Sequence, residues 1–165
     1  MSNKGFFAGL GIAGLGLAFA APADAQLLAR KDLSLAAALT IGTTAADLCK
    51  SQGYTVSVTV VGRNGEVILQ MRGDNAPPHT VENSFRKAYS ARTFRVPSGE
   101  LVQRVKDNPT APFVHLSNVV AAQGALPIKA GDDVIGAVGV SGAPGGEKDE
   151  VCAKAGIDKA ADTLK

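Results

Sequence analysis

A period-two alternation of side chains constrains the fold of this chain more than any other feature. Val56, Val58 and Val60 alternate with hydroxyl-bearing residues, so the valines share one face of a strand. The turn at Gly62–Gly65 contains Asn-Gly, a dipeptide that favours a tight hairpin connection, and residues 66–72 return as an antiparallel partner. The chain is therefore predicted to contain a β-hairpin.

Helical patterns lie on both sides of this hairpin. Ser34 can cap the N-terminus of a helix that runs to about Gln52, and Gly53 is suited to end it. Thr80 has the same capping chemistry ahead of a helix over Val81–Phe94. The residues expected to face the core are Leu35, Leu39, Gly42, Ala46 and Cys49 in the first helix, and Val81, Phe85 and Ala88 in the second.

The C-terminal half contains three further strand patterns and ends in a helix. A short helix over Glu100–Lys106 precedes the strands, and a helix starting near Asp149 is expected to break at Gly156. The expected strands are Leu116–Ala122, Gly124–Lys129, which Pro127 marks as an edge strand, and Val134–Ser141. Two antiparallel strand groups separated by helices predict an α+β domain with a five-stranded, mostly antiparallel sheet.

The first 25 residues have the organisation of an export signal. A positive charge near the N-terminus is followed by an apolar segment over residues 6–19 and by a small-x-small cleavage site at Ala23–Ala25. The apolar segment is short for a membrane span. We therefore expect a periplasmic or secreted protein, with residues 1–25 removed, a single domain over residues 26–165 and no membrane span after cleavage.

The overall charge argues against a nucleic-acid-binding protein. The chain has 17 Lys and Arg against 15 Asp and Glu, which gives a formal net charge of +2. It also lacks the basic run interleaved with aromatic residues that a nucleic-acid surface needs.

The two cysteines are candidates for a disulfide. Cys49 and Cys152 fall on separate predicted helices near opposite ends of the domain. In an oxidising compartment an isolated pair of this kind tends to form a disulfide, which we expect if the two helices pack together. The alternative is two separate buried thiols.

Segments spread over almost the whole domain resemble the GlcG/HbpS family of haem-binding proteins, which includes the C-terminal domain of the PduO cobalamin adenosyltransferases. The matching segments are LSLAAAL (33–39), VSVTVVGRNGEVILQMRGDNA (56–76), FRKAYSA (85–91) and GALPIKAGDDVIGAVGVSGAPGGEKDEVCAKAG (124–156). The resemblance implies a profilin-like three-layer α/β/α fold, assembly into homo-oligomers and binding of haem or a related tetrapyrrole. Two positions depart from the family's pattern. The hairpin turn lacks the aspartate that the family usually has after the first strand, and Ala125 stands in place of a family glycine.

His79 is the first choice for a protein ligand to haem iron. Neutral imidazole suits haem iron, and Pro77 and Pro78 restrict the backbone before this histidine. The alternative is a solvent-facing histidine at the entrance to a helix. His115 is the second choice, against the alternative of a partly buried histidine among apolar neighbours, and Met71 is the third.

Two cations and one loop could contact an anionic ligand. Arg72 and Lys87 are expected to pair with haem propionates, and the alternatives are a salt bridge to Asp74 or Glu82 or a plain solvated face. The glycine-rich loop at Gly142–Gly146 precedes a helix, where free backbone N–H groups can bind an anion, although such a loop can also be a simple turn.

These observations favour an exported haem- or tetrapyrrole-binding protein that sequesters, carries or senses its ligand. No serine or cysteine is paired with a base at an informative spacing, so no catalytic residue is assigned. Two alternatives stay open. One is a haem-independent small-molecule-binding or oligomeric interaction module, and the other is a weak haem-dependent redox or haem-degrading enzyme.

Overall fold

The computed structural model describes residues 28–165, and the predicted export signal lies outside them. The strands are β1 (Ser57–Val61), β2 (Val67–Arg72), β3 (Ala125–Ala130) and β4 (Asp133–Ser141). The helices are α1 (Leu35–Ser51), α2 (His79–Phe94), α3 (Ser98–Asp107) and α4 (Gly146–Ala160), with short 3₁₀ helices η1 (Pro112–His115) and η2 (Ala161–Thr163).

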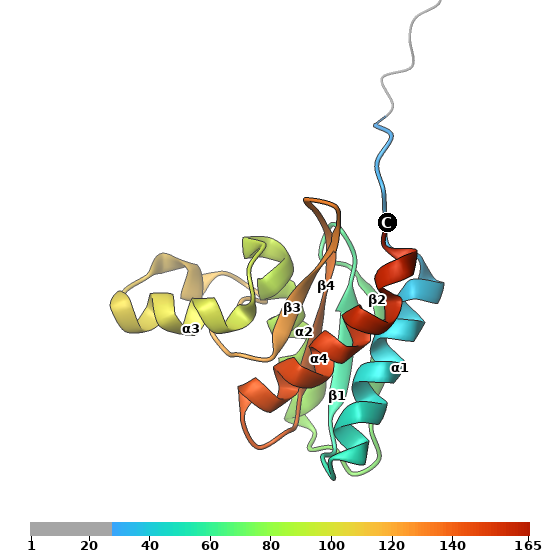
Figure 1. Ribbon diagram of the computed structural model, residues 1–165. Helices are drawn as coiled ribbons and strands as arrows, with labels where there is room; N and C mark the ends of the chain where they lie inside the picture. The colour runs from blue at the N-terminus through green and yellow to red at the C-terminus, as the bar shows by residue number, and fades with distance from the viewer. Residues whose placement is uncertain (1–27) are drawn as a thin grey trace, which may run out of the picture.

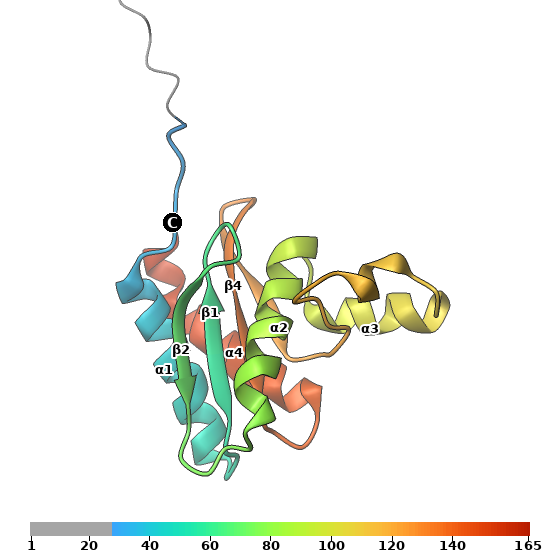
Figure 2. The same cartoon turned by 180° about the vertical axis from the view of Figure 1, so that it is seen from behind.

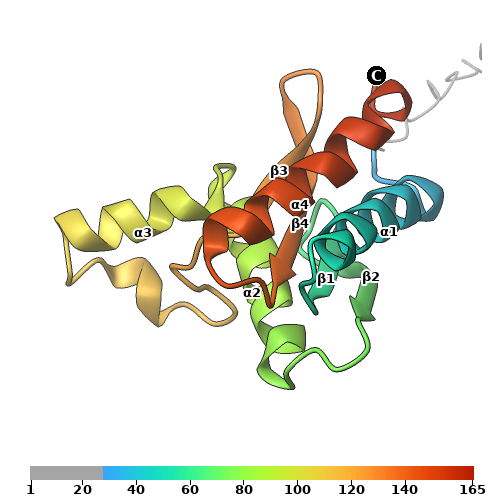
Figure 3. The same cartoon turned by 60° about the horizontal axis from the view of Figure 1, so that its bottom comes forward.

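The strands form one antiparallel sheet with helices on both faces. Its order is β2-β1-β4-β3, and each neighbouring pair is antiparallel. Helices α1 and α4 lie side by side over one face, in front of the strands in Figure 1. Helix α2 covers the opposite face, as the view from behind in Figure 2 shows, and α3 projects away from the sheet (Figure 3). The predicted α+β class is confirmed.

The predicted hairpin is confirmed as the pair β1 and β2. Val58 faces Met71 and Val60 faces Leu69 across the antiparallel pair. All five residues of β1 are buried, because β1 also pairs with β4 and lies between the two helical layers. The hairpin therefore supplies one central strand and one edge strand.

The sheet has four strands, so the prediction of a fifth strand over residues 116–122 was wrong. The chain there follows η1 and forms turns, with the Leu116 N–H donating to Phe113 O and the Val119 N–H donating to Leu116 O. Asn118 has a φ of 65°, which lies outside the extended region. An apolar run predicts burial but not backbone conformation, and here only part of it is buried, since Val119 is inside and Leu116 is 53% exposed.

Small residues, and not the predicted leucines, join α1 to α4. Leu35 and Leu39 are exposed, and the buried face of α1 comprises Ala37, Ala38, Ile41, Gly42, Ala45 and Cys49. A break was expected at Gly156, but α4 continues through it. Glycine is needed there for close contact with α1, because a Cβ would lie 2.3 Å from the Ile41 carbonyl oxygen. The predicted disulfide between Cys49 and Cys152 is present, with the two Cα atoms 5.7 Å apart.

Helix α2 packs on the sheet through hydroxyl groups as well as apolar side chains. The hydroxyls of Ser57 and Thr80 lie 2.7 Å apart, and those of Thr59 and Ser84 lie 2.8 Å apart, all in buried positions. Thr80 therefore sits inside the first turn and is not the N-cap that the sequence suggested. Ala88 is buried as expected, whereas Val81 and Phe85 are only partly buried.

Candidate functional site

A groove of about 490 Å³ opens where α2, α3 and the start of α4 approach the end of β4. Its walls come from segments far apart in the sequence, including the loop before β3. The lining residues are Pro77, His79, Asn83, Lys87, Val102, Ala122, Gln123, Ser141, Gly142, Ala143, Gly146 and Asp149. Two of the predicted site residues, His79 and Lys87, are therefore brought to one groove.

A buried ion pair between Lys87 and Asp149 lies against this groove. The Lys87 Nζ is 2.8 Å from the Asp149 Oδ2 and donates a second hydrogen bond of 3.0 Å to the Val140 carbonyl oxygen. The Asp149 Oδ1 accepts a hydrogen bond of 3.0 Å from the Ala143 N–H. The two side chains are 5% and 3% exposed. This pair joins α2 to β4 and to the first turn of α4.

Burial dominates the electrostatics of the pair. It raises the pKa of the Asp149 carboxyl above its ordinary value, and the nearby Lys87 ammonium opposes that change. Gly124 leaves the space that the ammonium occupies, since a Cβ at this position would lie 2.8 Å from the Lys87 Nζ. Lys87 is thus held by an acidic residue on another helix, and not by either of the partners considered from the sequence, Asp74 and Glu82.

His79 lies at the exposed side of the groove, as the first residue of α2. Asn83 follows one helical turn later and donates a hydrogen bond of 2.9 Å to the Ser141 hydroxyl. His79 and Asn83 also line a second, adjoining depression of about 330 Å³ together with Glu82 and Arg86. The imidazole is consequently accessible from two hollows that share this stretch of α2.

The remaining residues predicted to contact haem lie outside this groove. Arg72 donates from its Nε to the Ala76 carbonyl oxygen at 2.9 Å and lines a separate depression beside Tyr54. His115 belongs to η1 and is exposed, so the alternative of a partly buried histidine was wrong. Met71 is half-buried against the core.

Asn83, Ser141 and Asp149 are site residues that the sequence did not reveal. Asp149 stands in the acidic start of α4, inside the segment that matches the family best, and an acidic residue there is also expected merely from the helix dipole. Only the fold shows that its side chain is buried against a lysine 62 positions earlier.

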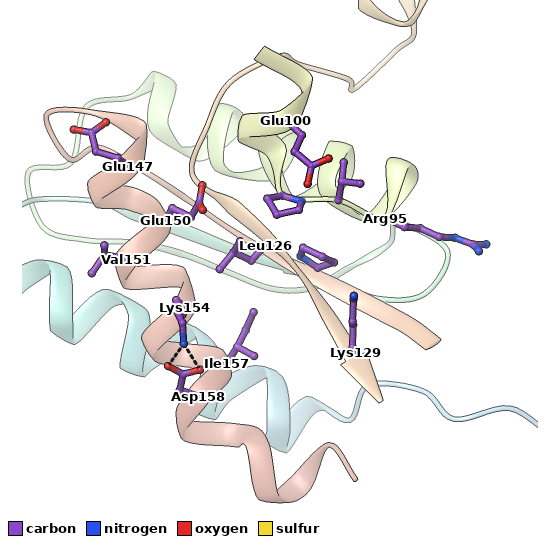
Figure 4. A pocket seen from close by; sticks show the side chains of 13 residues that line it. Arg95, Glu100, Leu126, Lys129, Glu147, Glu150, Val151, Lys154, Ile157 and Asp158 are labelled. Atoms are coloured by element: carbon purple, nitrogen blue, oxygen red, sulfur yellow. Dashed lines mark hydrogen bonds and ion pairs between the residues drawn. The ribbon is translucent and has the colours of Figure 1, made fainter. Parts of the chain in front are cut away.

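A larger depression of about 630 Å³, shown in Figure 4, lies between α4, β3 and the loop that joins α2 to α3. Its floor includes Leu126 and Ile157, and its charged residues are largely exposed and partly paired with each other, as Lys154 is with Asp158. No predicted site residue and no buried charge of the described chain lines it. We therefore place the candidate site at the groove that contains Lys87.

Within residues 28–165, no three His, Cys, Asp or Glu side chains gather closely enough to hold a metal ion by themselves. None of the helices in that same range combines the length and the apolar character that a membrane crossing requires.

Comparison with known proteins identifies the family. The family model described as "Haem degrading protein HbpS-like" matches residues 33–158. A double mutant of HbpS from Streptomyces reticuli, solved by crystallography, is 34% identical, with a TM-score of 0.77 over 84% of this chain and 96% of that one. The protein ORFY of Klebsiella pneumoniae is 26% identical, with a TM-score of 0.76 over 83% of this chain and 96% of its own.

The chain is also similar to a curated protein. An uncharacterized 15.0 kDa protein from the dhaT-dhaS intergenic region of Citrobacter freundii is 33% identical over 106 residues, which cover 62% of this chain and 74% of that protein. The family model spans most of the domain, and the solved structures share its arrangement of helices and strands. This chain belongs to the HbpS-like family.

Proposed function

We propose that this protein binds haem or a related tetrapyrrole, with His79 as the ligand to the iron. One observation carries the proposal: in a chain whose family is described by haem chemistry, an exposed imidazole stands at the side of a groove. Neutral imidazole is a common axial ligand of haem iron.

The residues around His79 fit a haem group. Pro77, Val102 and Ala122 give the groove apolar surface, which suits the face of a porphyrin. Arg86 lines the adjoining depression with His79, and a propionate there would share its guanidinium with the Val119 carbonyl oxygen and Glu82. Propionate contacts of Arg72 and Lys87 stay predictions, although Arg72 opens to a different depression.

The residues of the chain would position the group and shield it. Bound haem would supply an iron centre for redox chemistry. His79 would fix its orientation from the start of α2, where the rigid Pro77–Pro78 segment limits movement of the ring. The apolar lining would exclude water from the covered face of the porphyrin.

A hemin titration tests this proposal. We expect the wild-type protein to give a saturable shift of the Soret band, and the His79→Ala protein to lose most of that affinity. His115→Ala is the matched control, because it removes an exposed histidine from η1 and leaves the groove intact. Absence of saturable binding in the wild type would overturn haem binding, and an unchanged Soret band in His79→Ala would assign the ligand elsewhere.

Haem degradation is a second candidate, because the description of the matching family names it. If the protein degrades haem, ascorbate and oxygen should bleach the Soret band of the loaded protein faster than that of free hemin, with a bilin as the product. Equal bleaching rates would leave binding as the function.

The proposal includes export and self-assembly. We expect the protein recovered from the producing cells to begin at Gln26, which N-terminal sequencing would show, and an uncleaved N-terminus would contradict the export signal.

Light scattering of the purified protein should give a mass several times that of one chain, and a monomer would exclude the expected homo-oligomer.

A further inference from the structure

Two buried polar groups at the groove retain hydrogen-bonding capacity. The Lys87 ammonium has three N–H donors, of which Asp149 and Val140 accept two, and no other described residue accepts the third. The Ser141 hydroxyl accepts from Asn83 and can still donate its own proton. Lys87 is 4% exposed and Ser141 is 2% exposed, and both line the same groove. The groove therefore offers two sequestered donors to a ligand.

The surrounding backbone is specialised to create this arrangement. Gly124 and Gly142 have φ values of 126° and 136°, which other residues rarely adopt. A Cβ on Gly124 would collide with the Lys87 Nζ, and a Cβ on Gly142 would lie 2.3 Å from the Thr55 carbonyl oxygen. A buried ion pair is a weak source of net stability, because desolvation offsets most of its attraction. A concave site that combines such a pair with unsatisfied donors is typical of ligand binding.

We propose that this part of the groove binds the carboxylate of a small organic acid. One carboxylate oxygen accepts the third N–H of Lys87, and the carboxylate also accepts the Ser141 hydroxyl proton. The groove has ample room for such an acid, whose chain would lie against Val102 and Ala122.

The local charge balance favours a ligand with one negative charge over a ligand with two. Asp149 already balances the positive charge of Lys87, so a carboxylate makes the local sum −1. Phosphate is in part a dianion near neutral pH, and that form would bring a second charge toward the buried Asp149 carboxylate, so the repulsion would disfavour it. The acid would lie in the groove proposed for haem, so the two ligands would exclude each other, but acid binding needs Lys87 and Ser141 and does not need His79.

NMR titration of the purified ¹⁵N-labelled protein tests the proposal. The probes are acetate, pyruvate and inorganic phosphate, with acetamide as the neutral match for acetate. We expect saturable amide shifts around Lys87 and Ser141 with acetate or pyruvate, and at least tenfold weaker binding of acetamide and phosphate. His79→Ala should lose hemin binding and retain acid binding, which separates this proposal from the haem site.

Two variants identify the donors. Ser141→Ala removes one donor and leaves the ion pair, so we expect roughly tenfold weaker acid binding. The double variant Lys87→Met, Asp149→Asn removes both charges together and keeps an acceptor for the Ala143 N–H, and it should lose acid binding. If the double variant does not fold, Ser141→Ala decides. Absence of saturable shifts with either acid, equal binding of acetate and acetamide, or wild-type affinity in Ser141→Ala would overturn the proposal.

Discussion

The two faces of the sheet are built from different chemistry. On the α1 and α4 face, small apolar residues allow close helix contact, and the Cys49–Cys152 disulfide joins the two helices. On the α2 face, the apolar cluster is small, and buried hydroxyls supply many of the contacts. The Lys87–Asp149 pair joins this face to the first turn of α4 beside the groove. The comparison indicates that the first face provides much of the stability, and that the second holds polar groups in place for binding a ligand.

The largest expected effect comes from breaking the Lys87–Asp149 ion pair, which links α2 to the start of α4. Asp149→Ala leaves the Lys87 ammonium buried without its carboxylate, so we expect a loss of about 4 kcal/mol in the free energy of unfolding. Urea denaturation would measure it. The double variant Lys87→Met, Asp149→Asn should recover much of the loss, and additive losses would contradict a coupled pair.

Lys87→Met should make stability depend on pH in a definite direction. Burial already raises the pKa of Asp149 from the ordinary 3.8, and loss of the ammonium removes what opposes that rise. Since the folded-state pKa then exceeds the unfolded value further than in the wild type, the contribution of Asp149 to stability is full below pH 3.8 and is lost as pH rises through the folded pKa, so the variant should lose stability relative to wild type over that range. A variant whose stability relative to wild type is constant between pH 3 and 7 would contradict this assignment.

The disulfide tests the α1 and α4 face. Cys49→Ala, Cys152→Ala removes a cross-link between residues 103 positions apart, and we expect a loss of about 3 kcal/mol. Differential scanning calorimetry with and without reductant would measure it. Reductant should not change the melting temperature of the double variant, and hemin binding should persist because the disulfide lies on the opposite face. Loss of hemin binding in this variant would weaken the division between the two faces.

Removing the Thr59–Ser84 hydroxyl pair, between β1 and α2, should lower the free energy of unfolding by less. Thr59→Val keeps the shape of the side chain but removes the partner of the Ser84 hydroxyl and of the Gln70 amide, so we expect a loss of about 1 kcal/mol. Leu39→Ala is the control, because Leu39 is exposed on α1. Equal stabilities of Thr59→Val and wild type would mean that these buried hydroxyls contribute little to holding α2.

The smallest effect is expected at the Arg63–Asp133 pair, whose carboxyl is exposed. The hydrogen bond from the Arg63 guanidinium lowers the pKa of the Asp133 carboxyl, so this contact stabilises the fold above the ordinary pKa and is lost as pH falls through the lowered one. An NMR titration of the carboxyl should show the lowered midpoint, and Arg63→Gln should return it toward the ordinary value. An unchanged midpoint in the variant would contradict the assigned cause.

Local patterns predicted one part of the molecule well and the other poorly. The alternation at Val56, Val58 and Val60 and the Asn-Gly turn encode the hairpin within a short stretch, so the sequence predicted it correctly. The apolar run at residues 116–122 has no comparable periodicity, and the structure uses it as turns. The leucines of α1 were misplaced because helix contact at Gly156 selects small residues, which only the packed structure reveals.

The candidate site could be predicted only in part. His79 was recognised from its proline-rich loop and Lys87 from a matching motif, and both line the groove. Asp149 and Ser141 could not be assigned to it because they come from distant elements that meet only in the folded chain. Sequence reasoning therefore identified one wall of the groove, along α2, and missed the wall formed by β4 and α4.

The most direct test of the account is the hemin affinity of His79→Ala compared with that of His115→Ala. Both variants remove an exposed imidazole, but only His79 lines the groove on the α2 face. We expect His79→Ala to lower hemin affinity at least tenfold and to change the Soret maximum, while His115→Ala binds hemin like the wild type. Equal affinities and spectra in the two variants would contradict the assignment of the α2 face as the haem-binding face.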